Sequence, residues 1–272
     1  MILNLLQLGR ITYAEALTLQ RQLVELRHQQ RIDNTLLLLE HPPVLTLGRN
    51  SQRQNILADD ELLGRRGVEV HEINRGGDVT YHGPGQLVGY PILDLRSFTP
   101  RLGVVEYVRM LEEVLIRTCA GYGIVTQRIP KRTGVWTLPR GSISEKKIAA
   151  IGVHISRGIT SHGFALNVTT DLRDFDLIVP CGIADRPVTS LENEIDTRTR
   201  QSPNLEDSGN TAARHFGIVF GTQVLRRASL EDLLSDAKQP TGETPQLVPE
   251  DTPLSIPKEL KRLRGQEETV LA

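Results

Sequence analysis

Short runs rich in apolar and β-branched residues recur along most of the chain and predict a sheet of many strands. Each run is bounded by polar, glycine-containing or proline-containing segments, as strands usually are. The expected strands are 1–8, 35–39, 44–47, 68–73, 79–82, 87–95, 125–129, 134–138 and, after a turn, 186–191.

Apolar residues at helical spacing separate some of these runs. In the first such stretch they are Ala16, Leu19, Leu23 and Leu26. Thr12 and Glu15 precede them in the pattern of a capping box, which marks a helix N-terminus. Further helices are expected at 104–115, at 210–220 and from Ser229.

Two apolar runs, 146–155 and 159–168, are joined by Arg157-Gly158 and predict a β-hairpin of inner strands. Their small residues are Ala149, Ala150, Gly152, Gly163 and Ala165. A sheet lined by such residues leaves room for an extended apolar ligand. The alternative is a flat sheet packed under a helix.

Apolar periodicity stops at Asp236, and prolines then recur among polar residues. Such a segment buries too little apolar surface to offset the entropy of ordering it. We therefore divide the chain into one domain, residues 1–235, and a disordered or loosely attached tail, residues 236–272.

The composition is that of an ordinary soluble protein, with 272 residues, 39% hydrophobic and 24% charged, and a formal charge of −1. The charge argues against a nucleic-acid binder, and no apolar run approaches the ~18 residues of a membrane-spanning helix. Residues 1–8 are not typical of a signal peptide. Cys119 and Cys181 form no disulfide framework, so we expect a cytoplasmic protein.

A glycine-rich loop, Arg75-Gly-Gly-Asp-Val-Thr-Tyr-His-Gly-Pro-Gly-Gln86, surrounds the strand at 79–82. It matches neither the phosphate-binding loop nor the dinucleotide-binding fingerprint. Its density of hydrogen-bonding side chains favours a binding site over an ordinary hairpin turn.

Cys181 follows an apolar run and lies between Pro180 and Gly182, a corner that presents a thiol rather than packing it. The alternative is a small buried hydrophobe. Lys147 begins a buried strand, and its alternative is a surface lysine with its ammonium in water.

Three stretches together, Arg75–Gln86, Lys147–Gly152 and Pro180–Leu191, resemble the lipoyl(octanoyl) transferase family of lipoate biosynthesis. Glu40-His-Pro-Pro-Val44 and Gly134-Val-Trp136 match its pattern too. The resemblance covers roughly residues 1–225.

This resemblance implies an α+β domain with a mixed, largely antiparallel sheet flanked by helices, like the catalytic fold of the biotin and lipoate protein ligases. It implies transfer of an octanoyl group from octanoyl-acyl carrier protein to a lysine of lipoyl domains. These acceptors belong to 2-oxoacid dehydrogenases and the glycine cleavage H protein. We expect a monomer with no cofactor or metal and no nucleic-acid or membrane partner.

The resemblance also implies site residues. Cys181 is the cysteine of the acyl thioester and Lys147 the catalytic lysine, with His162 and Gly182 in support. The substrate-binding positions are Arg75, Gly76, Gly77, Asp78, Val79, Thr80, Tyr81, His82, Ala150, Ile151, Gly152, Gly163, Phe164 and Ala165.

Acyl transfer from a thioester to an amine needs no ATP, because the donor is already activated. An unperturbed thiol is only about 3% thiolate at pH 7, and a cation such as Lys147 raises that fraction. The rival mechanism is a Cys–His pair with His82 or His162. The rival functions are a cysteine-dependent thioesterase or hydrolase, a non-catalytic binding module and an ATP-dependent lipoate ligase.

Truncation before Pro240 should leave acyl transfer and the melting temperature nearly unchanged, because the tail lacks the apolar periodicity of a packed element. The measurement compares the full chain with the truncated protein by thermal unfolding and initial rate. A large drop in melting temperature would show that the tail is docked.

Overall fold

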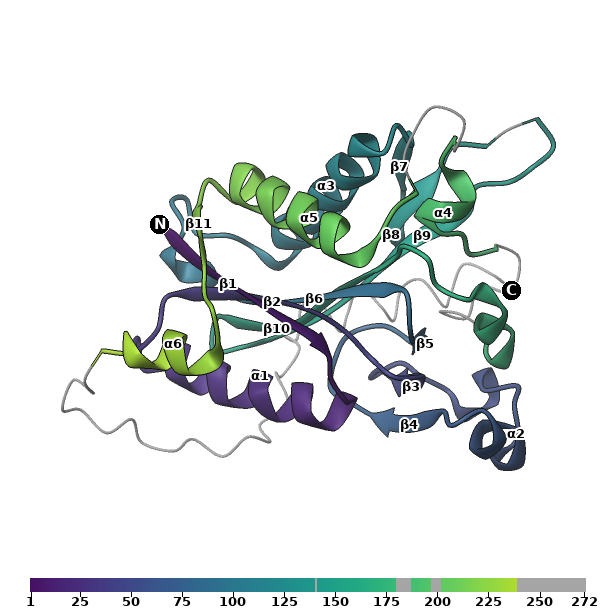
Figure 1. Ribbon diagram of the computed structural model, residues 1–272, viewed down its shortest axis with the longest axis horizontal. Helices are drawn as coiled ribbons and strands as arrows, with labels where there is room; N and C mark the ends of the chain where they lie inside the picture. The colour runs from purple at the N-terminus through teal and green to yellow at the C-terminus, as the bar shows by residue number, and fades with distance from the viewer. Residues whose placement is uncertain (140, 180–186, 197–201, 239–272) are drawn as a thin grey trace, which may run out of the picture. The chain divides into compact units, whose positions relative to one another are not determined.

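A mixed eight-stranded sheet organises the computed structural model, which describes residues 1–139, 141–179, 187–196 and 202–238 (Figure 1). In spatial order its strands are β11 (Gln223–Arg226), β1 (Ile2–Arg10), β2 (Asn34–Glu40), β6 (Gln86–Ile92), β10 (Ile159–Asn167), β9 (Lys147–Ser156), β8 (Arg132–Thr137) and β7 (Thr126–Ile129). β1 runs parallel to β2 and β11, and the other neighbours are antiparallel. The mixed, largely antiparallel sheet implied by the family resemblance is confirmed.

Helices cover both faces of this sheet (Figure 1). The helices are α1 (Tyr13–His28), α2 (Asp60–Arg65), α3 (Val104–Gly121), α4 (Leu191–Glu194), α5 (Leu205–Phe220) and α6 (Leu230–Ser235). Strand β2 is buried on both faces: Leu36 and Leu38 pack with α3 and α5, whereas Leu37 and Leu39 pack with α1 and α6. Its unbroken leucine run follows from this two-sided burial.

A second, smaller sheet holds β3 (Val44–Leu47) between β4 (Glu69–Glu72) and β5 (Val79–His82). β3 runs parallel to β4 and antiparallel to β5. Short 3-10 turns at Arg53–Asn55, Leu95–Ser97 and Leu172–Leu177 complete the described elements. Residues from the last of these turns, including Phe175 and Leu177, pack into the core of the small sheet.

The predictions that depend on residues close together in the sequence, the capping box and the β-hairpin, are confirmed. The Thr12 hydroxyl accepts from the Glu15 N–H, and the Glu15 carboxylate accepts from the Thr12 N–H at 2.9 Å, so the capping box is formed. The hairpin of β9 and β10 lies inside the sheet, as its apolar strands require.

The strand expected at 186–191 is wrong as an extended element. Val188 makes a single bridge to Lys147, and Leu191 already begins α4, because the Ser190 side chain caps that helix. Strand β11 and helix α2 were not predicted. Both are short and lie largely exposed, so their apolar pattern is weak.

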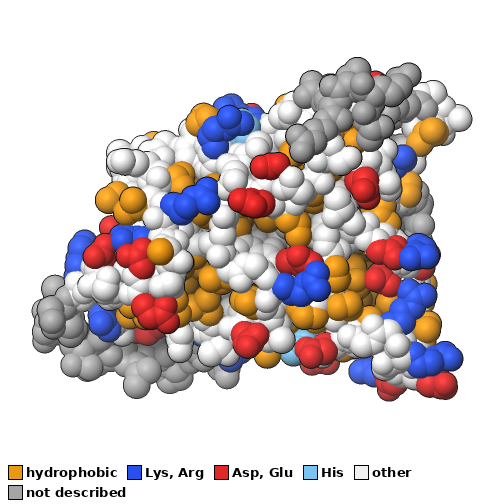
Figure 2. Space-filling view, viewed as in Figure 1, with side chains coloured by type: hydrophobic (Ala, Val, Ile, Leu, Met, Phe, Trp, Pro, Cys, Tyr) orange, Lys and Arg blue, Asp and Glu red, His pale blue; other side chains and the backbone are white. Residues whose placement is uncertain are grey.

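Figure 2 shows acidic and basic side chains interspersed over the face in view. Among the described helices, none is both long and apolar enough to cross a membrane. Residues 239–272, which include most of the predicted tail, lie outside the described part of the chain.

Candidate active site

Two adjoining cavities lie between the central hairpin and the smaller sheet. Counting the solvent space at their open mouths, the larger measures about 480 Å³ and the smaller about 300 Å³. Thr80, Ala150 and Ala165 line both cavities. The two cavities therefore adjoin at these three side chains, two of which are alanines.

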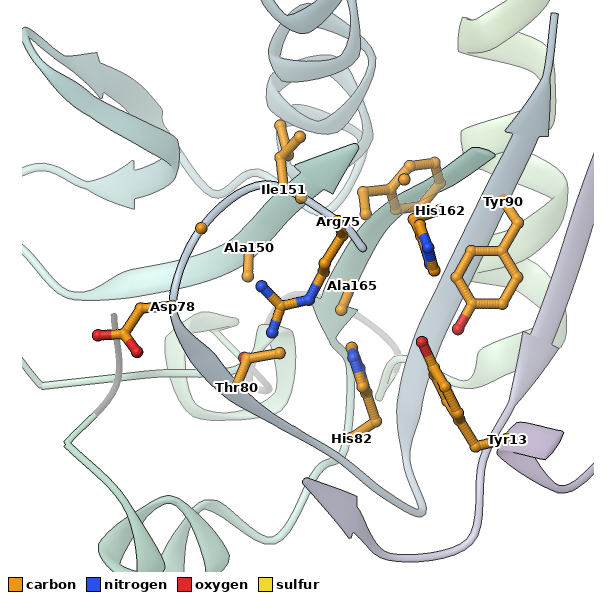
Figure 3. Close-up of a pocket in the computed structure, with 14 residues that line it drawn as sticks. Tyr13, Arg75, Asp78, Thr80, His82, Tyr90, Ala150, Ile151, His162 and Ala165 are labelled. Atoms are coloured by element: carbon orange, nitrogen blue, oxygen red, sulfur yellow. The ribbon is translucent and has the colours of Figure 1, made fainter. Parts of the chain in front are cut away.

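Most of the predicted binding positions line the larger cavity (Figure 3). They are Arg75, Gly77, Asp78, Thr80, His82, Ala150, Ile151, Gly152, Gly163, Phe164 and Ala165, joined by His162. Residues more than eighty positions apart in the sequence are thus brought to one cavity by the contact of the loop at 75–78 and β5 with the hairpin.

Three predicted positions do not line either described cavity. Side chains alternate along β5, so Thr80 and His82 face the cavity while Val79 and Tyr81 enter the core of the small sheet. The Tyr81 hydroxyl donates to Asp174 Oδ2 at 2.7 Å. Gly76 instead fixes the loop, since its N–H donates to the Val153 carbonyl of β9 at 2.9 Å.

The glycines of the hairpin are required by neighbouring chain segments rather than by ligand volume. A Cβ on Gly163 would lie 2.2 Å from the Gly89 carbonyl oxygen of the adjacent strand. A Cβ on Gly152 would lie 2.9 Å from Arg75 Cδ. Ala150 and Ala165, at the junction of the cavities, are therefore the small residues that leave space for a ligand.

Arg75 brings a buried guanidinium to the larger cavity. It donates to the Thr46 carbonyl at 2.7 Å and the Thr46 hydroxyl at 2.9 Å, and it is only 7% exposed. In Figure 3 the guanidinium points toward Ala150 and Thr80, at the junction with the smaller cavity. These hydrogen bonds to β3 hold the positive charge of Arg75 at the wall of the larger cavity.

A buried chain of hydrogen bonds fixes the tautomer of His82. Backbone carbonyls only accept, so Asn167 Nδ2 donates to the Thr189 carbonyl at 2.9 Å, and Asn167 Oδ1 accepts from Gln86 Nε2. Gln86 Oε1 then accepts from His82 Nδ1 at 2.7 Å. The proton of neutral His82 is therefore on Nδ1, and Nε2 carries the lone pair.

The buried histidines of the site are neutral. Burial lowers the pKa of His82 to about 3 and that of His41 to about 4. Burial, reinforced by the charge of Arg75, lowers the pKa of His162 to about 3. Groups with such low pKa values are weak proton acceptors near neutral pH.

Two tyrosines that sequence reasoning missed also line the larger cavity: Tyr13 from α1 and Tyr90 from β6. The Tyr90 hydroxyl donates to His41 Nε2 at 2.8 Å, while His41 Nδ1 donates to the Ile11 carbonyl. These contacts give His41 a structural role. Neither tyrosine had a sequence signal beyond its place in a predicted element.

Lys147 lies at the wall of the smaller cavity. Its Nζ is 5.3 Å from the centroid of the Trp136 ring, a cation–π distance. Its backbone N–H donates to the Pro187 carbonyl, and its carbonyl accepts from the Thr189 N–H, each at 2.9 Å.

Cys181 and Gly182 lie outside the described residues, within the interval 180–186. The described residues on both sides of that interval are held near the cavities. Val179 donates to the Asn55 carbonyl at 2.8 Å, and Asn55 donates to Asp78 at 2.6 Å. On the other side, Pro187 accepts from Lys147.

Cys119 is a packing residue. It is fully buried in the core under α3, and burial raises the pKa of its thiol to about 12. No three His, Cys, Asp or Glu side chains within the described ranges are grouped to hold a metal ion.

Residues 12–217 match the lipoyl protein ligase A/B catalytic domain family. The chain is 71% identical to an octanoyltransferase from Acidobacterium capsulatum, over 87% of this chain and 97% of that protein. It is 54% identical to an octanoyltransferase from Koribacter versatilis, over 98% of each.

Solved structures of similar fold include lipoate-protein ligase A bound with ATP, with a TM-score of 0.65 and 17% identity over 87% of this chain and 92% of that one. Another is a bi-partite lipoate protein ligase from Thermoplasma acidophilum, described with its E2 lipoyl domain. It has a TM-score of 0.63 and 18% identity, over 86% of this chain and 89% of that chain.

The free energy of unfolding should fall as the pH is lowered below about 6.5, the pKa of histidine in an unfolded chain. The folded protein resists protonation of His41, His82 and His162 until their lower pKa values are reached, so acid favours the unfolded chain. Each histidine contributes a slope of up to about 1.4 kcal/mol per pH unit across that interval.

Urea unfolding between about pH 7 and about pH 5 measures this slope. His41→Gln should lower the slope by up to about 1.4 kcal/mol per pH unit, the contribution of one histidine. Equal stability across this range in the wild-type protein would contradict burial of neutral histidines.

Proposed function

Since the chain belongs to the octanoyltransferases of the lipoyl protein ligase A/B catalytic domain family, and is thus an acyltransferase, we propose how it moves the octanoyl group. The donor is octanoyl-acyl carrier protein, the intermediate is a thioester on Cys181, and the acceptor is a lysine of a lipoyl domain. The reaction takes place in the cytoplasm without a cofactor.

The observation that supports this proposal is that the two cavities adjoin and share Thr80, Ala150 and Ala165 as lining residues. The larger offers Ala150, Ile151, Phe164 and Ala165 to an acyl chain, and the smaller contains Lys147. An octanoyl chain in the larger cavity therefore has its reactive end near the junction, beside the charges of Arg75 and Lys147. The described residues on either side of 180–186 are held by hydrogen bonds, Val179 to the Asn55 carbonyl and Pro187 to the Lys147 N–H, which supports a role for this segment at the site.

In the first step the Cys181 thiolate, paired with the Lys147 ammonium, attacks the donor thioester. The new carbon–sulfur bond forms as the bond to the carrier thiol breaks. The released carrier thiolate takes a proton from Lys147. An acyl-enzyme and a neutral Lys147 result.

In the second step the neutral amine of the acceptor lysine attacks the acyl-enzyme, and Lys147 accepts the amine proton. Collapse of the tetrahedral intermediate forms the amide and expels the Cys181 thiolate. The thiolate–ammonium pair is thereby restored, with no net proton gained or lost by the enzyme. Backbone N–H groups near Cys181 and in the glycine-rich loop are candidate donors to the oxyanion.

The low pKa values of His82 and His162 favour this mechanism over a Cys–His pair, since neither imidazole is a strong base. Lys147 supplies a cation at the smaller cavity instead. The acceptor is inferred from the family and from a structural relative described with its E2 lipoyl domain.

Incubation of the protein with octanoyl-acyl carrier protein and lipoyl domain, without ATP, should yield lipoyl domain octanoylated at one lysine. Mass spectrometry of the lipoyl domain and measurement of free octanoate separate the possible functions. Free octanoate as the main product would indicate a thioesterase, and an ATP requirement would indicate a ligase. A lipoyl domain whose acceptor lysine is replaced by arginine is the control.

Ala150→Leu should lower the rate with an octanoyl donor more than with a butanoyl donor, because the added side chain fills the junction of the cavities. Kinetics with both donors measure the ratio. Gly163→Ala is the comparison variant. Its Cβ meets the Gly89 carbonyl, so we expect lower stability and similar losses for both donors. Equal losses for Ala150→Leu would show that Ala150 does not border the acyl chain.

A further inference from the structure

Glu112 is a fully buried carboxylate on α3, behind the strands that carry Lys147 and Trp136. Its Oε2 lies 2.7 Å from Arg109 Nη1 and 3.2 Å from Arg128 Nε. Its Oε1 accepts from the Gly134 N–H of β8 at 3.1 Å. A buried carboxylate needs such partners to be stable. One Glu112 oxygen therefore binds the backbone of β8, and the other pairs with the two arginines.

Gly134 has a backbone conformation that only glycine adopts readily, with φ +121°. A Cβ at this position would lie 2.8 Å from Lys147 Cε and 2.6 Å from the Ala149 carbonyl oxygen. The stem of Lys147 therefore passes through the space that the missing Gly134 side chain leaves.

This backbone and the Trp136 ring confine Lys147. Its Nζ is 5.3 Å from the ring centroid, and Trp136 pairs with Lys147 across β8 and β9, next to an irregularity in the register at Val135. A lysine side chain has a flexible four-carbon stem, so fixed neighbours on β8 limit where its ammonium can lie. The hydrogen bond from the Gly134 N–H to Glu112 attaches this part of β8 to α3.

We propose that Glu112 is a positioning residue for acyl transfer, because it fixes the Gly134 backbone and thereby the side chain of Lys147. This inference rests on the proposed function, in which Lys147 pairs with Cys181 and exchanges protons. Glu112 itself contacts neither cavity; it acts through Gly134.

The test compares Glu112→Gln with Glu113→Gln. An amide has one oxygen, so the substituted side chain at position 112 cannot accept from both Gly134 and the arginines, whereas the Glu113 carboxylate pairs with Arg117 and Arg128. Glu112→Gln should lower kcat by roughly ten- to a hundredfold with a smaller change in KM for the donor. Glu113→Gln should leave both nearly unchanged.

A second readout is the rate of Cys181 alkylation by iodoacetamide as a function of pH. Cys119 is fully buried, so the reaction of the folded protein reports on Cys181. Glu112→Gln should shift the curve toward higher pH, in the direction of Lys147→Met. Gly134→Ala leaves Glu112 in place but presses on Lys147, and it should shift the curve likewise.

If Lys147→Met shifts the curve while Glu112→Gln and Gly134→Ala match Glu113→Gln, the positioning role is overturned and the proposed function stands. A lower melting temperature for Glu112→Gln with unchanged kcat and alkylation would likewise overturn it. If Lys147→Met itself changes neither transfer nor alkylation, the proposed role of Lys147 fails. Should Glu112→Gln not fold, Glu112→Asp takes its place, since its shorter side chain withdraws the carboxylate from the Gly134 N–H; an unshifted alkylation curve for Glu112→Asp would overturn the positioning role.

Discussion

The close approach of chain segments around the central hairpin is the constraint on which the site depends. β6 and β10 meet where Gly163 has no side chain, and the loop at Arg75 reaches β9 because Gly152 has none. The Gly76 N–H then joins that loop to the Val153 carbonyl. These contacts hold the smaller sheet against the larger one, and the cavities are the space that remains between them beside Ala150 and Ala165.

The charges of the site follow from the same burial. Arg75 is held by carbonyl and hydroxyl acceptors of β3, and Lys147 lies against an aromatic ring, whereas the histidines are kept neutral. Cations beside a partly enclosed cavity stabilise a thiolate and a developing oxyanion more strongly than they would in bulk water. The local environment thus suits acyl chemistry on a thiol better than proton transfer by imidazole.

Sequence patterns predicted elements formed by neighbouring residues. The full set of residues that line the site could not be predicted, because it depends on contacts between distant segments. The capping box at Thr12 and the hairpin after Lys147 could be predicted because neighbouring residues form them. Tyr13 and Tyr90 could not be placed at the cavity, because their positions depend on how α1 and β6 pack. Likewise Gly163 is small because of the neighbouring Gly89 carbonyl, which only the strand order reveals.

Intact-mass spectrometry after incubation with octanoyl-acyl carrier protein alone tests the central claim most directly. The account predicts one octanoyl adduct on Cys181, sensitive to hydroxylamine, that disappears when lipoyl domain is added. The adduct should persist in Cys119→Ser, whose thiol is buried in the wild-type protein, and be absent from Cys181→Ala. An active Cys181→Ala protein, or transfer that proceeds with no adduct, would contradict a covalent mechanism.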